Sequence, residues 1–331
     1  MLFSLIRGLY LRGKVLFLCK HNARNATLMR NLLIYKYIDE IVRSGSVRKA
    51  AEVLAITPSS LNRRIQSVEQ ELGTPLFERN AWGLRLNLAG EIALHTFRAH
   101  LAEIEALKVR IADIKGSRRG KISIVCSQAF LPHFLPLQIT MFQKAYPFVQ
   151  FSVTIADSHS AERMLMNYET DLALLFSPLS MNNLETITSV SQKIFAIMSD
   201  THPLASYDSL KLSQCAQYPL ALHNPSSSVR SMLDQFARKT RLELHPVLET
   251  DSYILLHNFV SVSRAIGFEI DIGHSDKLEQ GIIKRPLKFP STNRPFISLS
   301  QLRGRTLPVS AAKFAEQISS FFDESNEQSS I

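Results

Sequence analysis

The chain has 331 residues, of which 45% are hydrophobic, and it carries a net charge of +9. This length allows two or three domains with their own cores, and the hydrophobic content excludes a disordered protein. The three cysteines, Cys19, Cys126 and Cys215, are far apart, so neither a disulfide framework nor a zinc site is indicated.

Basic residues are concentrated in the first part of the chain. Residues 1–120 contain 20 Lys and Arg against 10 Asp and Glu, whereas the remainder contains 18 against 19. A phosphate-binding surface needs cations clustered on one module, so this distribution predicts that only the front of the chain meets a polyanion. A basic segment at a membrane surface is the competing interpretation.

Residues 1–29 mix short apolar runs with Arg and Lys. The longest apolar run, Val15–Cys19, is too short to span a bilayer. A signal peptide would need a longer apolar core and a small-residue cleavage site, and both are missing. We therefore expect a disordered extension or a spurious start, with Met29 a plausible true start, and a cytoplasmic protein.

The next segments predict a pair of helices preceded by a supporting helix. From residue 30 to residue 43 the apolar side chains have a helical period, and Ser44-Gly45 ends the run. Ser46 is a candidate N-cap for the next helix, in which Ala50 and Ala51 are small enough to let another helix approach closely.

A further helix is expected to begin at Thr57-Pro58. Threonine is a good N-cap, and proline at the first helical position loses no hydrogen bond. Its apolar face consists of Leu61, Ile65, Val68 and Leu72, and Gly73 ends it.

Short hydroxyls, an amide and guanidinium groups gather near the start of this helix, mostly off its apolar face. Such groups on the leading turns of an exposed helix read base edges and phosphates in the major groove of DNA. A solvated amphipathic helix pair is the alternative. Together with neighbouring segments, the candidate DNA-binding residues are Arg48, Thr57, Pro58, Ser59, Ser60, Asn62, Arg63, Arg64, Arg79 and Arg85.

Residues 74–91 predict a small hairpin, because Leu76-Phe77 and Leu84-Arg85-Leu86 alternate around a turn at residues 80–83. A wing of this kind beside a recognition helix typically grips the DNA backbone. Arg79 and Arg85 are the expected contacts, and Trp82 is either a third contact or ordinary packing.

The longest helical pattern covers residues 89–115. Its apolar residues, from Phe97 to Ile114, are spaced by threes and fours like a coiled-coil seam. A monomer buries so narrow a stripe poorly, so we expect it to pair with its copy in a second chain and to place two recognition helices on successive half-sites. Residues 116–121 follow as a solvated hinge.

From residue 122 to residue 324 short apolar strands alternate with helices. This alternation predicts a mostly parallel sheet with helices on both faces. Two such sets are present, so we expect two α/β lobes, a last helix at 311–324 that returns to the first lobe, and a frayed tail from Ser325. The cleft between such lobes favours an anion, because the exposed N–H groups and dipoles of helix N-termini meet the strand ends there, and a small ligand is the default hypothesis.

Two other functions would use the same lobes. A solute-binding protein needs only the rear lobes, but the export signal is missing and a basic helix-turn-helix has no use outside the cell. A cleft enzyme is disfavoured because there is no P-loop, G-x-S-x-G or H-E-x-x-H motif, and the ten histidines are scattered. We therefore expect no catalytic residue, no metal site and no cofactor.

Four motifs in the front half resemble the winged helix-turn-helix and linker helix of LysR-type transcriptional regulators. They are G-S-x3-A-A-x2-L at 45–54, L-x-R-x-I-x3-E-x2-L-G at 61–73, L-F-E-R at 76–79 and L-x-L-x2-A-G-E at 84–91. The rear half is similar to the periplasmic-binding-protein-like effector domain of that family. The resemblance implies a DNA-binding domain at 30–88, a dimerisation helix at 89–115 and an effector-binding domain at 122–324.

The implied function is a sequence-specific transcription regulator controlled by a small-molecule effector. It would bind an interrupted inverted repeat in double-stranded DNA as a homodimer or homotetramer, and it would contact RNA polymerase if it is an activator. The effector-binding positions carried over from the family are Ser127, Gln128, Phe176, Ser177, Ser227, Ser228, Thr250, Gly267 and Phe268. Serines before helices are more often N-caps, and Phe268 is more often core.

The sequence departs from the family pattern at two places. Pro58 directly follows Thr57, where the family commonly has a glutamine and carries the proline one place later. In the run at 265–271, Ala265 replaces the first of two glycines, and Glu269 enters a run that is apolar in the family. We therefore expect different base contacts at the helix start and a different effector pocket.

Overall fold

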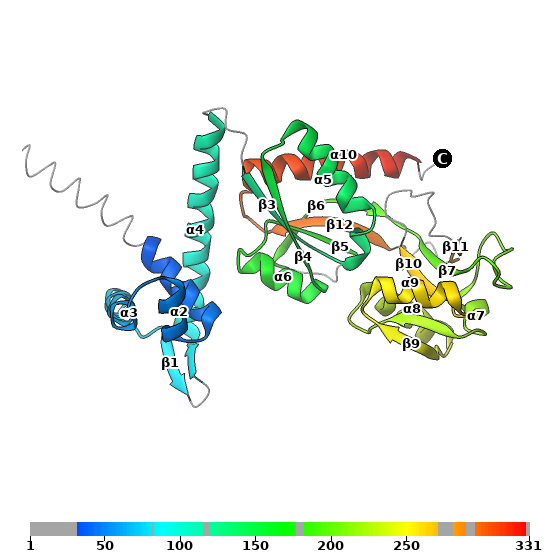
Figure 1. Ribbon diagram of the computed structural model, residues 1–331, viewed down its shortest axis with the longest axis horizontal. Helices are drawn as coiled ribbons and strands as arrows, with labels where there is room; N and C mark the ends of the chain where they lie inside the picture. The colour runs from blue at the N-terminus through cyan, green and yellow to red at the C-terminus, as the bar shows by residue number, and fades with distance from the viewer. Residues whose placement is uncertain are drawn as a thin grey trace, which may run out of the picture. The chain divides into compact units, whose positions relative to one another are not determined.

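The computed structural model describes residues 32–80, 83–114, 120–176, 182–270, 281–288 and 295–328. The chain divides into two compact units, residues 1–105 and 106–331 (Figure 1). The predicted extension at 1–29, Trp82, hinge residues 116–119 and Ser177 lie outside the described residues. None of the helices in the described ranges is long and apolar enough to cross a membrane.

The first unit contains the predicted helix pair and hairpin. A helix at residues 32–44 is followed by α2 (Val47–Val53), α3 (Pro58–Leu72), β1 (Phe77–Asn80), β2 (Gly83–Leu86) and α4 (Leu88–Ile114). Ala50 and Ala51 of α2 are completely buried in one cluster with Ile41, Leu61 and Ile65. The two small side chains thus let α2 and α3 approach closely, as predicted.

The turn between α2 and α3 fixes where α3 begins. The Thr57 side chain caps the helix by accepting from the Ser60 N–H at 3.2 Å, Pro58 takes the first position, and Gly73 ends it with φ +70°. These features confirm the predicted boundaries. Two details were wrong: Ser46 makes no capping bond through its side chain, and Leu72 is 50% exposed because, at the last position of the helix, it joins neither buried cluster.

Three residues connect α3, the hairpin and α4: Glu69, Asn87 and Gly90. The Glu69 Oε1 accepts from the Leu76 N–H at 2.8 Å. The Asn87 Oδ1 caps α4 by accepting from the Gly90 N–H at 2.9 Å, while its Nδ2 donates to the Pro75 carbonyl at 2.9 Å. A Cβ added to Gly90 would stand 2.1 Å from the Leu76 carbonyl oxygen. Only glycine therefore permits this close approach of α4 to the hairpin.

Helix α4 buries part of the predicted intermolecular seam inside the first unit. Phe97 is buried and stacks on Tyr35, with ring centroids 4.1 Å apart. Phe97 is therefore a core residue of this unit rather than a seam residue. Farther along α4, Leu107 and Ile111 are 53% and 47% exposed.

The first lobe of the second unit is built on a five-stranded sheet of order β4-β3-β5-β12-β6. Its strands are β3 (Gly120–Cys126), β4 (Val149–Ile155), β5 (Leu172–Phe176), β6 (Leu184–Ser191) and β12 (Phe296–Leu302), and its helices are η1 (Gln128–Phe130), α5 (Phe134–Ala145), α6 (Ser158–Met166) and α10 (Val309–Gln328). Helix α10 packs on β3, β6 and α5. The chain thus returns to this lobe for its last helix, as predicted.

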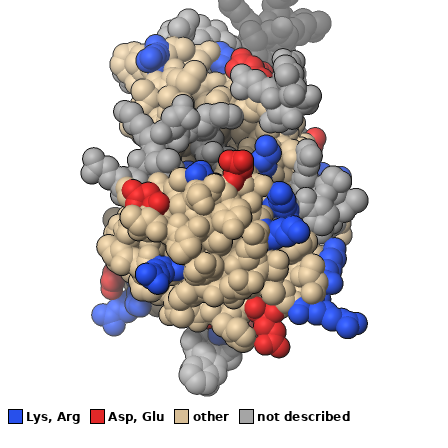
Figure 2. Space-filling view, turned by 90° about the vertical axis from the view of Figure 1, so that its right-hand side faces the viewer, with Lys and Arg blue, Asp and Glu red and all other residues tan. Residues whose placement is uncertain are grey.

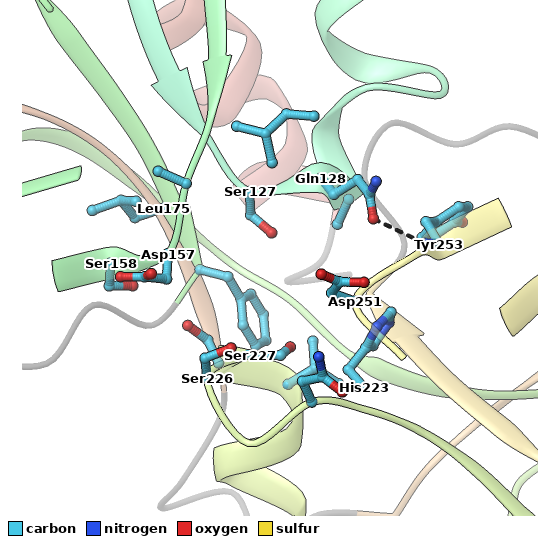
Figure 3. A pocket seen from close by; sticks show the side chains of 17 residues that line it. Ser127, Gln128, Asp157, Ser158, Leu175, His223, Ser226, Ser227, Asp251 and Tyr253 are labelled. Carbon is cyan, nitrogen blue, oxygen red and sulfur yellow. Dashed lines mark hydrogen bonds between the residues drawn. The ribbon is translucent and has the colours of Figure 1, made fainter. Parts of the chain in front are cut away.

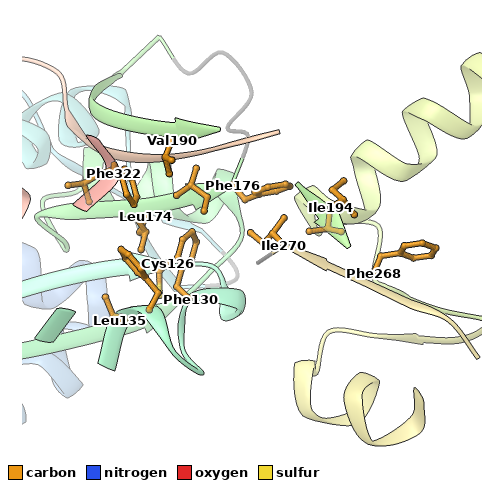
Figure 4. Close-up of a cluster of buried hydrophobic side chains, with 14 of the residues drawn as sticks. Cys126, Phe130, Leu135, Leu174, Phe176, Val190, Ile194, Phe268, Ile270 and Phe322 are labelled. Carbon is orange, nitrogen blue, oxygen red and sulfur yellow. The ribbon is translucent and has the colours of Figure 1, made fainter. Parts of the chain in front are cut away.

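The second lobe contains two small sheets. Strand β7 (Ile194–Ser199) lies between β10 (Gly267–Ile270) and β11 (Ile282–Pro286), and β8 (Leu220–His223) pairs parallel with β9 (Pro246–Thr250). Its helices are α7 (Leu212–Cys215), α8 (Ser228–Thr240) and α9 (Tyr253–Val262). One buried cluster runs through both lobes, with Phe176 of the first near Ile194 and Ile270 of the second (Figure 4).

Several predicted elements need correction. The sheets are mixed rather than mostly parallel: β12 re-enters the first lobe and runs antiparallel to β5 and β6, and β7 is antiparallel to both of its neighbours. The short β11 and α7 were missed. The tail predicted from Ser325 continues α10 to Gln328, and Gly120 and Lys121, assigned to the hinge, open β3.

Replacing Gly90 with alanine should destabilise the first unit by about 1–3 kcal/mol, because the new Cβ meets a backbone carbonyl that cannot move aside. Urea unfolding followed by fluorescence measures this, since the single tryptophan of the chain, Trp82, lies in this part of the sequence. The adjacent Ala89→Gly variant is the control and should lose only about 1 kcal/mol through helix propensity. A Gly90→Ala variant more stable than the wild type would refute the close approach.

Candidate functional site

The candidate DNA-reading surface is the side of α3 opposite its buried residues. Leu61, Ile65 and Val68 are at most 6% exposed, which fixes the rotation of the helix about its axis. Pro58, Ser59 and Arg63 are then exposed, and Ser60, Asn62 and Arg64 are half-buried. The predicted polar residues thus lie together on the leading turns of α3.

These polar side chains differ in how far they are already engaged. The Thr57 hydroxyl is used in capping α3, and the Arg64 guanidinium lies over the Tyr37 ring, 5.1 Å from its centroid. On α2, Arg48 is 3.6 Å from Glu52 at the surface. Within the described ranges, the Arg63 guanidinium has no hydrogen-bond or ion-pair partner. Arg63 is therefore the cation on these turns that is free to bind phosphate or a base.

The hairpin has the geometry of the predicted wing. Its two strands pair antiparallel, with Arg79 opposite Leu84 and Arg85 opposite Glu78. Arg85 is exposed, whereas the side chain of Arg79 lies outside what the structure describes. Arg85 thus remains available for a backbone contact, and Glu78 lies directly across the ladder from it.

A second candidate site is a cavity of about 140 Å³ between the two lobes of the second unit (Figure 3). Its wall is formed by residues 127–129 after β3, 155–158 at the end of β4, 175–176 of β5, 223–224 after β8, 226–229 at the start of α8, and Asp251 and Tyr253 after β9. An engineered cavity of about 150 Å³ holds benzene. The interlobe cavity therefore suits a small molecule.

Five of the nine predicted effector residues line this cavity: Ser127, Gln128, Phe176, Ser227 and Ser228. The Gln128 Oε1 accepts from the Tyr253 N–H at 2.8 Å, so one hydrogen bond joins the two lobes at the cavity wall. Ser227 stands at the N-cap of α8, but its side chain makes no capping bond. The first N–H groups of α8 have no partner within the helix and lie beside the cavity.

Three predicted effector residues do not line the cavity. Thr250 is buried, and its hydroxyl accepts from the Ser252 N–H at 3.0 Å. Phe268 is 1% exposed in the core, and a Cβ on Gly267 would meet Leu256 at 2.7 Å. These positions serve packing and turn formation because they lie inside the second lobe rather than at its edge.

The residues missed from the sequence share one property. Asp157, His223, Asn224, Asp251 and Tyr253 all line the cavity, and each ends a strand, follows its carboxyl end or opens the next helix. Ligands of α/β sheets bind beyond the carboxyl ends of the strands. That rule, applied to β4, β8 and β9, was the signal in the sequence that could have found them.

The cavity wall is acidic. Asp157 accepts hydrogen bonds from Ser160, chiefly from its backbone N–H, which lowers the pKa of this carboxyl and keeps it ionised. Asp251 has no ion-pair or hydrogen-bond partner for its side chain in the described part of the chain. Burial lowers the pKa of His223, which favours the neutral imidazole. Among the described residues of this wall there is no lysine or arginine.

Glu269, the sequence departure in β10, is 2% exposed and contacts Tyr253, a residue of the cavity wall. Its Oε2 accepts from the Tyr253 hydroxyl at 2.6 Å and lies 2.7 Å from the His257 Nε2, and its Oε1 lies 2.8 Å from the Lys284 Nζ. Burial alone would raise the pKa of Glu269, but the hydrogen bond from His257 and the charge of Lys284 outweigh it and lower the pKa to about 2. Because a carboxylate only accepts, His257 carries a proton on Nε2.

Reactive thiols and metal-binding side chains offer no further site in the described part of the second unit. Burial raises the pKa of Cys126 and of Cys215 to about 12, so both thiols stay protonated. Among the described residues, no three metal-binding side chains cluster. On the face shown in Figure 2, acidic and basic side chains are interspersed among uncharged residues rather than forming a basic field.

Comparisons with known proteins match both halves of the chain. Residues 34–91 match the bacterial regulatory helix-turn-helix protein family, lysR type, and residues 115–323 match the LysR substrate binding domain. The uncharacterised HTH-type transcriptional regulator YybE of Bacillus subtilis is 27% identical over 289 residues, which cover 87% of this chain and 98% of YybE.

Solved structures show the same fold. A full-length OxyR variant from Pseudomonas aeruginosa is similar with a TM-score of 0.68 at 17% identity, over 87% of this chain and 94% of that one. Full-length CbnR in complex with its target DNA is similar with a TM-score of 0.58 at 16% identity, over 87% and 98%. The chain therefore belongs to the LysR family and is a transcriptional regulator with a DNA-binding helix-turn-helix and an effector-binding domain.

Proposed function

We propose that this regulator reads double-stranded DNA with α3 in the major groove and the hairpin on the backbone. The observation that carries this proposal is the orientation of α3, which buries Leu61, Ile65 and Val68 and turns Ser59 and Arg63 outward. The similarity in fold to CbnR, whose structure was solved with its target DNA, supports it. Arg48 and Arg85 would add backbone contacts on either side.

We further propose that the protein acts in the cytoplasm as a dimer or a dimer of dimers on an interrupted inverted repeat. The exposed Leu107 and Ile111 of α4 support pairing of this helix with its copy, since they are apolar side chains one turn apart. Two paired chains would place two copies of α3 on successive half-sites. Contact with RNA polymerase follows if the protein activates transcription.

The interlobe cavity is the proposed effector site. A ligand there would touch both lobes, so it would stabilise the arrangement in which residues from β3 and from β9 are close together. Such a ligand changes the activity only if it binds two arrangements of the protein with different affinities. The cross-lobe hydrogen bond from Tyr253 to Gln128 marks the arrangement that the ligand would favour.

The charges of the wall favour an effector that carries an ammonium group. Asp157 and Asp251 contribute two carboxylates, and no lysine or arginine offsets them in the part of the wall that the structure describes. Arg230 donates to the His223 carbonyl, but Asp234 and Glu249 already pair with it. At an effective dielectric constant of about 20, a charge about 4 Å from an opposite one gains about 4 kcal/mol, and a like charge loses as much. The N–H groups at the start of α8 favour an anion by at most about 2 kcal/mol, so the two carboxylates outweigh them and a simple carboxylate is disfavoured.

Replacing Arg63 with alanine should weaken binding to an operator selected in vitro from random duplex DNA by about 1–3 kcal/mol, because this free guanidinium faces outward from α3. If the contact is to a phosphate, the slope of log K against log salt should also fall by about 1. Fluorescence anisotropy over a salt titration measures both quantities.

Two further variants serve as controls for that experiment. Arg238→Ala, at an exposed position of α8, should bind as the wild type does. Arg64→Ala removes the contact between the Arg64 guanidinium and the Tyr37 ring. The free energy of unfolding of the first unit should therefore fall by about 0.5–1 kcal/mol. If Arg63→Ala bound the operator with wild-type affinity at every salt concentration, Arg63 would not be part of the DNA interface.

Small primary amines should raise the melting temperature of the second unit, whereas carboxylates of the same carbon skeleton should not. Benzylamine against benzoate and butylamine against butyrate are suitable pairs. At about 100 times its Kd a ligand stabilises the folded state by about 2.7 kcal/mol, which calorimetry and thermal unfolding both detect.

Asp251→Asn should weaken amine binding, because it removes an unpaired carboxylate while keeping the shape of the side chain. Asp208→Asn, at an exposed aspartate of the same lobe outside the cavity, is the matched control and should bind amines normally. Binding of benzoate in preference to benzylamine would contradict the proposed charge of the effector.

A further inference from the structure

The buried carboxylate of Glu269 is not explained by packing alone. A buried ion pair is often no more stabilising than apolar side chains of similar volume, because desolvation offsets the attraction. In this chain the carboxylate accepts hydrogen bonds from the Tyr253 hydroxyl and the His257 Nε2–H, and it forms an ion pair with the Lys284 ammonium. The first two belong to α9 and the third to β11. One side chain of β10 therefore holds two neighbouring elements.

Tyr253 connects this buried cluster to the wall of the cavity. Its ring stacks on His257 with centroids 4.1 Å apart, its hydroxyl reaches Glu269, and its backbone N–H donates to the Gln128 Oε1 of the first lobe at 2.8 Å. The same residue thus has a bond to the inside of the second lobe and a bond to the opposite lobe. Figure 3 shows the second of these bonds at the edge of the cavity.

We infer that Glu269 is a positioning residue, which anchors Tyr253 so that its N–H is held where Gln128 of the other lobe accepts it. The hydroxyl of Tyr253 and the imidazole of His257 lie one helical turn apart on α9 and share the same carboxylate oxygen. Both hydrogen bonds can form at the same time only in one position and one rotation of the first turn of α9 relative to β10. This position of α9 in turn places the Tyr253 N–H within reach of the Gln128 Oε1.

The anchoring of Tyr253 by Glu269 fixes part of the cavity wall. It rests on the proposed function in one respect, namely that the interlobe cavity is the effector site. Since Tyr253 and Gln128 both line that cavity, loosening Glu269 would change the shape that the effector meets without touching the effector. The path runs from the sheet of the second lobe to the first lobe through four residues: Lys284, Glu269, Tyr253 and Gln128.

Hydrogen exchange of the full-length protein tests this without any ligand. In the wild type the Tyr253 amide should be protected, because it is bonded across the lobes. In Tyr253→Phe, which removes one hydroxyl and keeps the Glu269–Lys284 pair, this amide should exchange at least about tenfold faster. Glu269→Met, which has about the same size but no oxygen acceptor, should have the same effect. Mass spectrometry with single-residue fragmentation resolves the amide.

The double variant and a matched control complete the design. If the hydroxyl acts through the carboxylate, Tyr253→Phe with Glu269→Met should exchange no faster at this amide than the faster single variant. Tyr207→Phe, at a half-exposed tyrosine of the same lobe, should exchange as the wild type does. Amides of β8 give the reference for the stability of the whole lobe.

Two outcomes would overturn the inference. One is unchanged exchange of the Tyr253 amide in both single variants. The other is a rise by the same factor at Tyr253 and throughout β8, which would show that Glu269 only stabilises the lobe. Failure of amines to bind the wild type, in contrast, would contradict the proposed effector class and leave this result intact, since no ligand enters the exchange experiment.

Discussion

The burial of Leu61, Ile65 and Val68 decides which side of α3 is available to DNA. Only one rotation of the helix about its axis buries all three of these side chains, and this rotation exposes the side chains on the opposite face. Thr57 and Gly73 then fix where the helix begins and ends, and Glu69 binds the backbone at the start of the hairpin. Helix α3 thus carries the candidate DNA-reading residues and also holds the hairpin in place through Glu69.

In the second unit, the directions of the strands decide which residues surround the cavity. Ser127, His223 and Asp251 are far apart in sequence, yet each follows or ends a strand at its carboxyl end, and the three strand ends surround one cavity. Antiparallel β12 adds no residue to this cavity, because it enters the sheet from the second lobe and runs the other way. The cavity therefore depends on the strands that run parallel, β3 with β4 and β5, and β8 with β9.

Local signals predicted most of the fold and less of the sites. Caps and periodicity located α3 and the hairpin because Thr57, Pro58 and Gly73 act within a few residues of themselves. The contact of Arg64 with Tyr37 joins residues on separate helices, so no local pattern shows it. Phe97 looked like a seam residue because periodicity gives the face of a helix but not the partner that covers it. Elements as short as β11 and α7 carry too few residues to show a period.

Glu269 shows where sequence reasoning ends for this protein. Its charge in an apolar run marked the position as unusual, but its partners come from α9 and β11, twelve to sixteen residues away, and are found only in the fold. Replacing it with an apolar residue would leave three polar groups of the second lobe without this acceptor. The carboxylate fixes the place of α9 through two hydrogen bonds from residues one helical turn apart, and this geometry argues for a positioning role.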